Sequence, residues 1–140
     1  MLVEYDKVSV YQEEKLILKD VDFTLNEGEF VYLTGKVGTG KSSFLKTLYG
    51  ELPVLKGQAH VMEYDLTKIK PRQLQELRRN IGIVFQDFKL LQDRTVYRNM
   101  KFVLKATGWK KRDEIDARID EVLNLVDMVG KKDSLPSELS

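Results

Sequence analysis

The chain begins with two segments rich in apolar side chains, and in the first of them apolar and charged residues alternate. They cover residues 2–11 and 15–25, are rich in Val, Ile, Leu, Tyr and Phe, and are separated by the polar sequence QEE. Alternation with a period of two is typical of strands that bury one face, and a short polar connection favours antiparallel pairing. The sequence therefore predicts an antiparallel strand pair, followed by a turn at 26–28.

Two later segments are apolar almost without interruption. Residues 29–34 read EFVYLT and residues 81–85 read IGIVF. Short runs of this kind are typical of strands that a parallel sheet buries on both faces. Residues 59–64, AHVMEY, predict a further strand. We therefore expect a sheet that begins antiparallel and continues into a parallel core.

Helices are predicted between and after these strands. The first covers residues 41–49 and has an apolar face made of Phe44, Leu45 and Leu48. Pro71 suits the first position of a second helix over 71–80, because its fixed backbone angle fits there and its missing N–H is not needed. Strands and helices alternate along the chain, so the expected fold class is α/β.

Two more helices are predicted in the second half of the chain. Thr95 can cap a helix over 96–108, and another begins at Asp113. Apolar residues then recur at helical spacing: Ile115, Ile119, Val122, Leu123 and Val126. The last ten residues are polar turn material.

Composition limits the classes of function. The 23 basic and 22 acidic residues give a net charge of +1, so we expect no nucleic-acid partner, and any polyanion must be held locally. Without cysteine the chain has no disulfide and no thiolate metal site. It shows neither a secretory signal nor an apolar run of about 18 residues. We expect a soluble intracellular protein that reaches a membrane only through a partner.

A glycine-rich loop follows the segment 29–34 and has the pattern G-x-x-x-x-G-K-[ST]. Its glycines let the backbone curl so that several N–H groups point at one phosphate. The following helix adds its N-terminal N–H groups and the positive end of its dipole. A flexible glycine turn is the alternative, and the flanking strand and helix patterns disfavour it. The predicted nucleotide-binding residues are Gly35, Lys36, Val37, Gly38, Thr39, Gly40, Lys41, Ser42 and Ser43.

Individual side chains of this loop have predicted roles. The Lys41 ammonium reaches the β and γ phosphates, and the Ser42 hydroxyl coordinates Mg²⁺. Gln86 then stands at the predicted end of strand 81–85, within IGIVFQDFKLLQ and 45 residues beyond Lys41. In this arrangement the chain resembles the ATP-binding-cassette (ABC) ATPases, in which a glutamine at this point helps to ligate Mg²⁺ and senses the γ phosphate. The resemblance implies a P-loop fold of ABC type, with Mg²⁺ held by Ser42 and Gln86.

The resemblance also assigns roles near the two ends of the chain. Tyr11 matches the position at which this family stacks an aromatic residue on adenine, and simple strand packing remains the alternative. LPSELS matches the run into the signature motif of the family, with Leu139 and Ser140 as its first two residues. The chain would then be the N-terminal part of one such domain, with a core at about 1–90 and the start of a helical subdomain at 91–140.

The resemblance further implies a function and partners. It suggests an ATP-binding subunit that dimerises with its own kind and lies at the inner face of the cell membrane through an integral membrane, permease-like subunit. EFVYLTGKVGTGKSSFLKTLYG and IGIVFQDFKLLQDRTVYRNM are most similar to the cell-division branch. Lipoprotein-releasing and macrolide-export ATPases are the alternatives.

The resemblance places the hydrolytic groups of the family beyond residue 140, so no catalytic residue is expected within this chain. The Mg²⁺ carboxylate, the catalytic base and the switch histidine are the groups concerned. Asp87 and Asp93 are predicted to be turn residues rather than bases. We therefore expect the chain to bind Mg-ATP without hydrolysing it. Because the central sheet of the family also takes strands from beyond residue 140, an exposed apolar sheet edge is expected as well.

Two rival functions can be compared with these motifs. One is a phosphate-loop enzyme of another class, such as a GTPase or a nucleoside kinase. A GTPase should carry Asn-Lys-x-Asp, which does not occur here, and its Asp-x-x-Gly pattern is found only at 127–130, far along the chain from the loop. A non-catalytic interaction module would instead use the segment 87–107, including Phe88 and Leu91, to dock a membrane partner. His60 and Trp109 are expected to be structural or packing residues rather than site residues.

Overall fold

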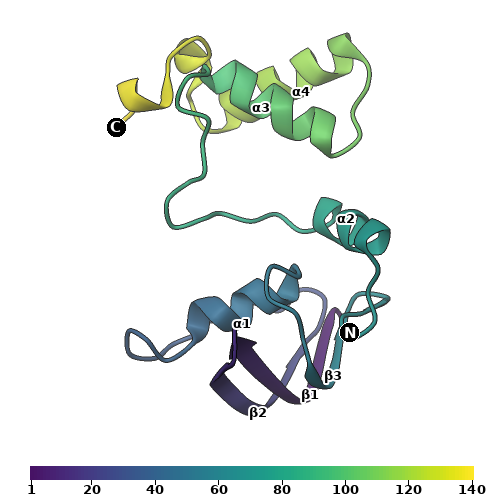
Figure 1. The fold of residues 1–140 in the computed structure, drawn as a ribbon. Coiled ribbons are helices and arrows are strands. Elements are labelled where there is room, and N and C mark those ends of the chain that lie inside the picture. The colour runs from purple at the N-terminus through teal and green to yellow at the C-terminus, as the bar shows by residue number, and fades with distance from the viewer. The chain divides into compact units, whose positions relative to one another are not determined.

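Two hydrophobic cores organise the chain in its computed structural model, which describes all residues from 1 to 140. One core belongs to residues 1–82 and the other to residues 83–140, and these two ranges form separate structural units (Figure 1). No helix in either unit is both long enough and apolar enough to cross a bilayer.

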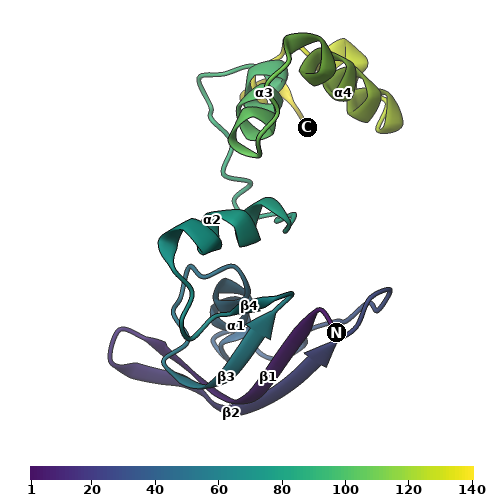
Figure 2. The same ribbon diagram turned by 90° about the vertical axis from the view of Figure 1, so that its right-hand side faces the viewer.

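The first unit is built on an antiparallel sheet with the strand order β2-β1-β3-β4 (Figure 2). The strands are β1 (Val3–Gln12), β2 (Lys15–Leu25), β3 (Lys56–Val61) and β4 (Tyr64–Asp65). The predicted pairing of the first two segments is confirmed, with Tyr11 opposite Leu16. β3 runs along the other side of β1, where Ala59 lies opposite Tyr5.

Two helices, α1 (Lys41–Leu48) and α2 (Pro71–Arg79), pack on this sheet and begin where the sequence predicts. The ring of Phe44 on α1 meets the ring of Tyr5 edge to face at 5.4 Å between centroids. The Tyr5 hydroxyl lies 2.9 Å from the Thr47 hydroxyl, and burial raises the pKa of Tyr5 to about 12. From α2, Leu77 is fully buried in the same core. Leu45, which the sequence placed on the apolar face of α1, is exposed.

A bulge in β1 explains one glycine of β3. The pairing register of β1 shifts between Tyr5 and Val8, and Lys7 has a φ of 50°. The Lys7 N–H donates to Asp22 at 2.8 Å. A Cβ at Gly57, whose φ is 94°, would lie 2.4 Å from the Lys7 carbonyl oxygen. No side chain fits at this position.

The two predicted buried strands are not formed. Residues 29–34 and 81–85 have no strand structure, and Phe30, Tyr32 and Val84 are 79%, 81% and 91% exposed. A parallel strand needs hydrogen-bonding neighbours and helices over both faces. The sheet of this chain consists of antiparallel pairs alone, so neither segment has a strand to pair with. Apolar side chains of both segments are exposed, but not as the sheet edge that the sequence predicted, because neither segment is a strand.

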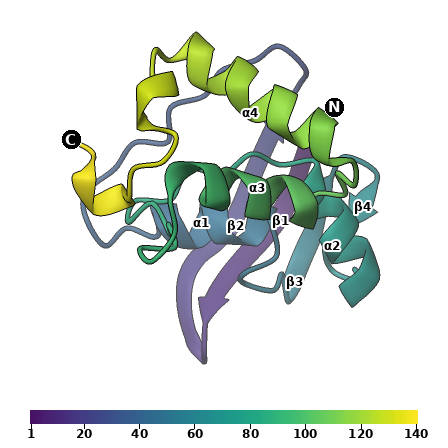
Figure 3. The same cartoon turned by 90° about the horizontal axis from the view of Figure 1, so that it is seen from above.

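The second unit is a helix pair, α3 (Val96–Ala106) and α4 (Arg112–Leu125), which lie side by side (Figure 3). The predicted cap is confirmed, because the Thr95 hydroxyl accepts the Arg98 N–H. The buried residues of α4 follow the predicted helical spacing: Ile115, Ile119 and Leu123. Val126 is exposed instead, because the helix ends at Leu125. Short 3₁₀ turns follow at Val129–Lys131 and Pro136–Glu138.

Candidate functional site

The glycine-rich loop leads directly into the N-terminus of α1. The Phe44 N–H donates to the Gly40 carbonyl at 2.9 Å and so closes the first helical turn. The N–H groups of Lys41, Ser42 and Ser43 precede this bond, and the first N–H groups of a helix have no acceptor within it. They stand at the positive end of the helix dipole. The loop and the helix thus form one anion-accepting backbone.

Two glycines of the motif are required by close contacts. A Cβ at Gly40, whose φ is 95°, would lie 2.7 Å from the Ile17 side chain on β2. A Cβ at Gly35, whose φ is 152°, would lie 2.9 Å from the Thr39 hydroxyl. Gly38 has a φ of 81° and open space around it. The curled path of the loop therefore depends on residues without side chains.

Lys41 folds back over this loop. Its Nζ donates to the carbonyl oxygens of Gly35 and Lys36, both at 2.7 Å. The Thr39 hydroxyl donates to the same Lys36 carbonyl at 2.8 Å. An ammonium group has three donors, so one remains for another acceptor. The loop is thus curled around the Lys41 ammonium group, at the point where the motif predicts that phosphates bind.

Tyr11 belongs to the same unit as the loop. It is partly buried on β1, beside the pair that Val10 forms with Leu18. Leu18 in turn lies against Gly40, where a Cβ would come within 3.0 Å of its side chain. The strand pair that carries Tyr11 is thus the surface on which α1 begins.

The other predicted site residues lie in the second unit. Gln86 is exposed in a turn that the Phe88 N–H closes on the Phe85 carbonyl at 3.1 Å. The sequence had predicted that Gln86 follows a strand, but residues 81–85 form none. The structure therefore brings Tyr11 and the loop together in one unit but leaves Gln86 in the other. Leu139 and Ser140 follow the second 3₁₀ turn.

The carboxylate next to Gln86 is engaged. Asp87 forms an ion pair with Lys89 at 2.7 Å, and the hydrogen bond from Lys89 lowers the pKa of the Asp87 carboxyl. No group of three or more His, Cys, Asp or Glu side chains gathers to hold a metal ion.

An apolar cavity of about 540 Å³ lies in the second unit. The sequence had indicated Phe88 and Leu91 as docking residues, and both line it. Met100, Phe102 and Val103 of the predicted docking segment 87–107 line it too, and the structure adds Val122 of α4. Asn99 also lines the cavity, and its side chain binds the backbone of Leu91 at the rim. The sequence had not indicated Asn99 as a site residue.

Known proteins resemble this chain in sequence. A family model described as ABC transporter matches residues 18–140. The cell division ATP-binding protein FtsE of Streptococcus pneumoniae serotype 2 is 41% identical over 135 residues, covering 96% of this chain and 58% of that protein. The methionine import ATP-binding protein MetN 1 of Acinetobacter baylyi is 40% identical over 123 residues, covering 88% of this chain and 34% of that protein. The methionine import branch is one that the sequence alone had not suggested.

A solved structure is similar over nearly the whole chain. It is the dimeric post-hydrolysis state of the ATP-binding cassette MJ0796 bound to ADP and Pi, with a TM-score of 0.85 and 27% identity. The match covers 99% of this chain and 63% of that one, so the chain spans only part of its relatives' length. The predicted P-loop fold class is confirmed. The family match and the shared fold together show that the chain belongs to the ABC transporter family.

Proposed function

We propose that this chain is the nucleotide-binding part of an FtsE-like ATPase, which acts in cell division with an FtsX-like membrane partner. The observation that carries the proposal is the curled loop, with Lys41 held over it and α1 directed at it. The similarity to FtsE over 96% of the chain supports the cell-division branch. MetN-like, lipoprotein-releasing and macrolide-export ATPases are the alternatives within the family.

The loop residues fit Mg-ATP. The backbone N–H groups of the loop and of α1 would surround the phosphates, and there is no room for a Cβ at Gly35 or Gly40. Lys41 would bind the β and γ phosphates, with the Ser42 hydroxyl and the Gln86 carbonyl as Mg²⁺ ligands. Tyr11 would stack on adenine. Bound Mg²⁺ would neutralise part of the phosphate charge.

Phosphate binding would give Lys41 stronger partners. Its ammonium group now donates to two neutral carbonyls, whereas phosphate oxygens carry negative charge and would add Coulombic attraction to the hydrogen bonds. Removing the ammonium should therefore weaken nucleotide binding far more than it disturbs the fold.

Titration of the 140-residue chain with Mg-ATP by calorimetry tests this proposal. We expect Lys41→Ala to weaken binding at least tenfold. Lys46→Ala changes the same residue type on the same helix, but its side chain pairs with Glu51 instead of the loop, and it should bind like the unmodified chain. A chain that binds no ATP, or GTP more tightly than ATP, would contradict the proposal.

We further propose that the isolated 140-residue chain binds ATP without turning it over. Asp87 is held by Lys89 with a lowered pKa, which makes it a poor base. Asp93, the other carboxylate considered, lies in a turn. ATP turnover that Lys41→Ala abolishes would show that this proposal is wrong. The separate proposal that the chain binds nucleotide would still stand.

The apolar cavity of the second unit is the proposed docking site for a cytoplasmic helix of the membrane partner. Such a helix would insert apolar side chains between α3 and the segment 85–91. This contact would keep the protein at the cytoplasmic face of the membrane, and the complete subunit would act as a homodimer, as MJ0796 does in its solved structure.

Binding to the partner tests the docking role separately from nucleotide. Phe88→Asp should abolish capture of FtsX from detergent extracts, whereas Leu125→Asp, at an exposed position that does not line the cavity, should not. If capture survives Lys41→Ala but not Phe88→Asp, docking is independent of nucleotide. Capture of a methionine permease subunit instead of FtsX would favour the alternative branch.

A further inference from the structure

One stretch of the second unit carries basic residues and no acidic ones. Between Asp93 and Asp113 the sequence contains no Asp or Glu. The basic residues there are Arg94, Arg98, Lys101, Lys105, Lys110, Lys111 and Arg112. This leaves 16 of the 23 basic residues for the rest of the chain, against all 22 acidic ones. The near-neutral total charge therefore hides a strongly positive segment, here called the basic surface.

Most of these cations are not neutralised within the chain. Only Lys111 and Arg112 pair with carboxylates, those of Glu114 and Asp116. Arg98, Lys101 and Lys105 are spaced by three and four residues on α3 and so project from one side of the helix. Arg98 and Lys105 are exposed there. Lys101 lies toward Asp116 and donates to the Tyr97 hydroxyl, whereas Arg98 and Lys105 present positive charge to the solvent.

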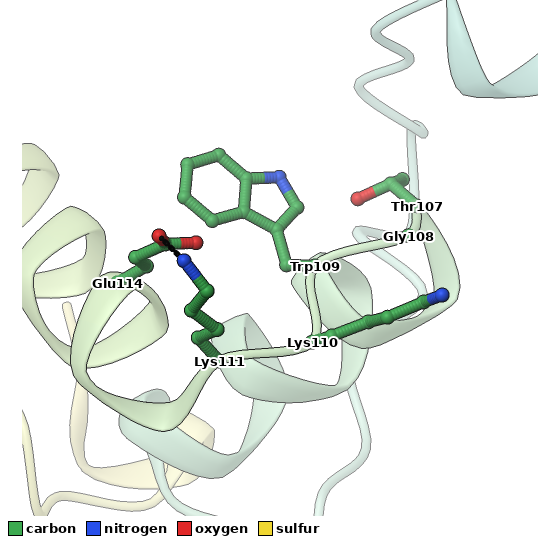
Figure 4. A pocket seen from close by; sticks show the side chains of 6 residues that line it. All are labelled: Thr107, Gly108, Trp109, Lys110, Lys111 and Glu114. Carbon is green, nitrogen blue, oxygen red and sulfur yellow. Dashed lines mark hydrogen bonds and ion pairs between the residues drawn. The ribbon is translucent and has the colours of Figure 1, made fainter.

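Aromatic rings lie within the basic surface. Trp109, the only tryptophan of the chain, sits in the connection between α3 and α4 and is 38% exposed. It lines an open cavity of about 450 Å³. Figure 4 shows Lys110 extending away from the indole, whereas Lys111 turns to Glu114, with 2.9 Å between the charged atoms. Phe102 is exposed on α3, with the Arg94 guanidinium 5.8 Å from its ring centre.

We propose that the basic surface binds the anionic headgroups of a lipid bilayer, with Trp109 at the water–lipid boundary. Tryptophan is enriched at that boundary, because its ring is apolar and its N–H is polar. Each Lys or Arg close to an anionic bilayer strengthens binding about fivefold. Arg98, Lys105 and Lys110, which form no ion pair with a carboxylate, would together be enough for reversible attachment.

The charge distribution favours a bilayer over other polyanions. The rest of the chain is rich in acidic residues, and these would repel a long nucleic acid that wraps around it. A bilayer touches only the surface that faces it. The long, exposed side chains of Arg98, Lys105 and Lys110 also suit mobile headgroups, which adapt to them, better than the fixed carboxylates of a folded partner.

The fluorescence of the single tryptophan tests the proposal on the unmodified chain. We expect vesicles of phosphatidylcholine with phosphatidylglycerol to shift the Trp109 emission to shorter wavelength, and brominated lipid to quench it. Vesicles of phosphatidylcholine alone should change neither. Added salt should reverse the effect, because it screens exposed charges. Emission that responds equally to both kinds of vesicle, or to neither, would overturn the proposal.

Charge reversal identifies the surface in a vesicle sedimentation assay. The double variant Lys105→Glu, Lys110→Glu should bind phosphatidylglycerol vesicles at least tenfold more weakly. The matched control is Lys15→Glu, Lys19→Glu, at exposed positions on β2, and it should bind like the unmodified chain. Circular dichroism checks that both variants keep their helices, and the fluorescence test decides the matter if either does not.

Two further results separate lipid binding from its rivals. Binding to polyglutamate or to a DNA oligonucleotide, with no binding to phosphatidylglycerol vesicles, would assign the basic surface to another partner and overturn the proposal. Lys41→Ala should leave vesicle binding unchanged, because the loop lies in the other unit. Lipid binding and nucleotide binding can therefore fail independently.

Discussion

The side chain of Asn99 satisfies both backbone groups of Leu91. The Leu91 N–H donates to Asn99 Oδ1 at 2.9 Å, and Asn99 Nδ2 donates to the Leu91 carbonyl at 3.0 Å. The same amide nitrogen lies within hydrogen-bond distance of the carbonyls of Arg94 and Thr95, which precede α3. One side chain thus holds the segment that forms the rim of the apolar cavity.

Replacing Asn99 by Asp should destabilise the second unit by about 1–3 kcal/mol, because the carboxylate cannot donate to the partly buried carbonyls of Leu91 and Thr95. Urea unfolding followed by Trp109 fluorescence measures this. Asn124→Asp is the control, since the Asn124 amide donates only to the Asp120 carbonyl near the surface. FtsX capture should fall together with the stability of Asn99→Asp. Equal stability of the two variants would contradict the role given to Asn99.

Gly57→Ala should destabilise the first unit by about 2 kcal/mol or more, through the clash with the Lys7 carbonyl and the positive φ. Gly82→Ala is the matched control, because nothing lies within 4 Å of a Cβ there and its φ is not positive. The comparison is made by thermal unfolding followed by circular dichroism. If Gly57→Ala unfolds at the same temperature as Gly82→Ala, the bulge does not require glycine.

The stability of the first unit should fall as pH rises between about 10 and 12. Burial raises the pKa of Tyr5 from 10.0 to about 12 in the folded chain, so the unfolded chain loses this proton first. The stabilisation is complete below pH 10 and is lost as the pH rises toward 12, by roughly 2–3 kcal/mol in total.

Tyr5→Phe separates this effect from the other groups that titrate in the same range. The variant should lose the added pH dependence and also about 1 kcal/mol at neutral pH, because the hydroxyl no longer meets Thr47. Chemical unfolding of both proteins across the alkaline range measures the difference. Parallel pH profiles for the two proteins would show that Tyr5 does not carry the effect.

Residues 30–33 should make the chain self-associate, because four consecutive apolar side chains are exposed there and their backbone has no strand partner. Sedimentation velocity at increasing concentration measures this. Tyr32→Lys should reduce the association, whereas Leu125→Lys, at an exposed position outside this segment, should not. A chain that stays monomeric at every concentration would be evidence against an adhesive segment.

Elements with local signals were predictable from the sequence. Thr95 marks the start of α3 because its side chain caps the helix directly, and Pro71 marks α2 because its ring fixes the backbone. The β1–β2 pair follows from alternation and a short connection. In each case, residues close together in the sequence provide both the pattern that predicts the element and the contact that forms it.

Features that depend on distant partners were not predictable. The apolar sequence of 29–34 indicates a buried strand, but a strand also needs neighbours, and none pairs with it. The glycines of the loop were predicted from the motif, whereas the contact of Gly40 with Ile17 required the fold. Asn99 was missed because bonds from a side chain to the backbone leave no periodic pattern.

The position of Lys41 has a consequence for the speed of nucleotide exchange. Because the ammonium group bridges two successive carbonyls, it holds the loop in its curled path. Under the proposed function, an arriving phosphate would have only to draw one flexible side chain away, and exposed side chains change rotamer within nanoseconds. Nucleotide would then enter this loop with no slow rebuilding of the backbone.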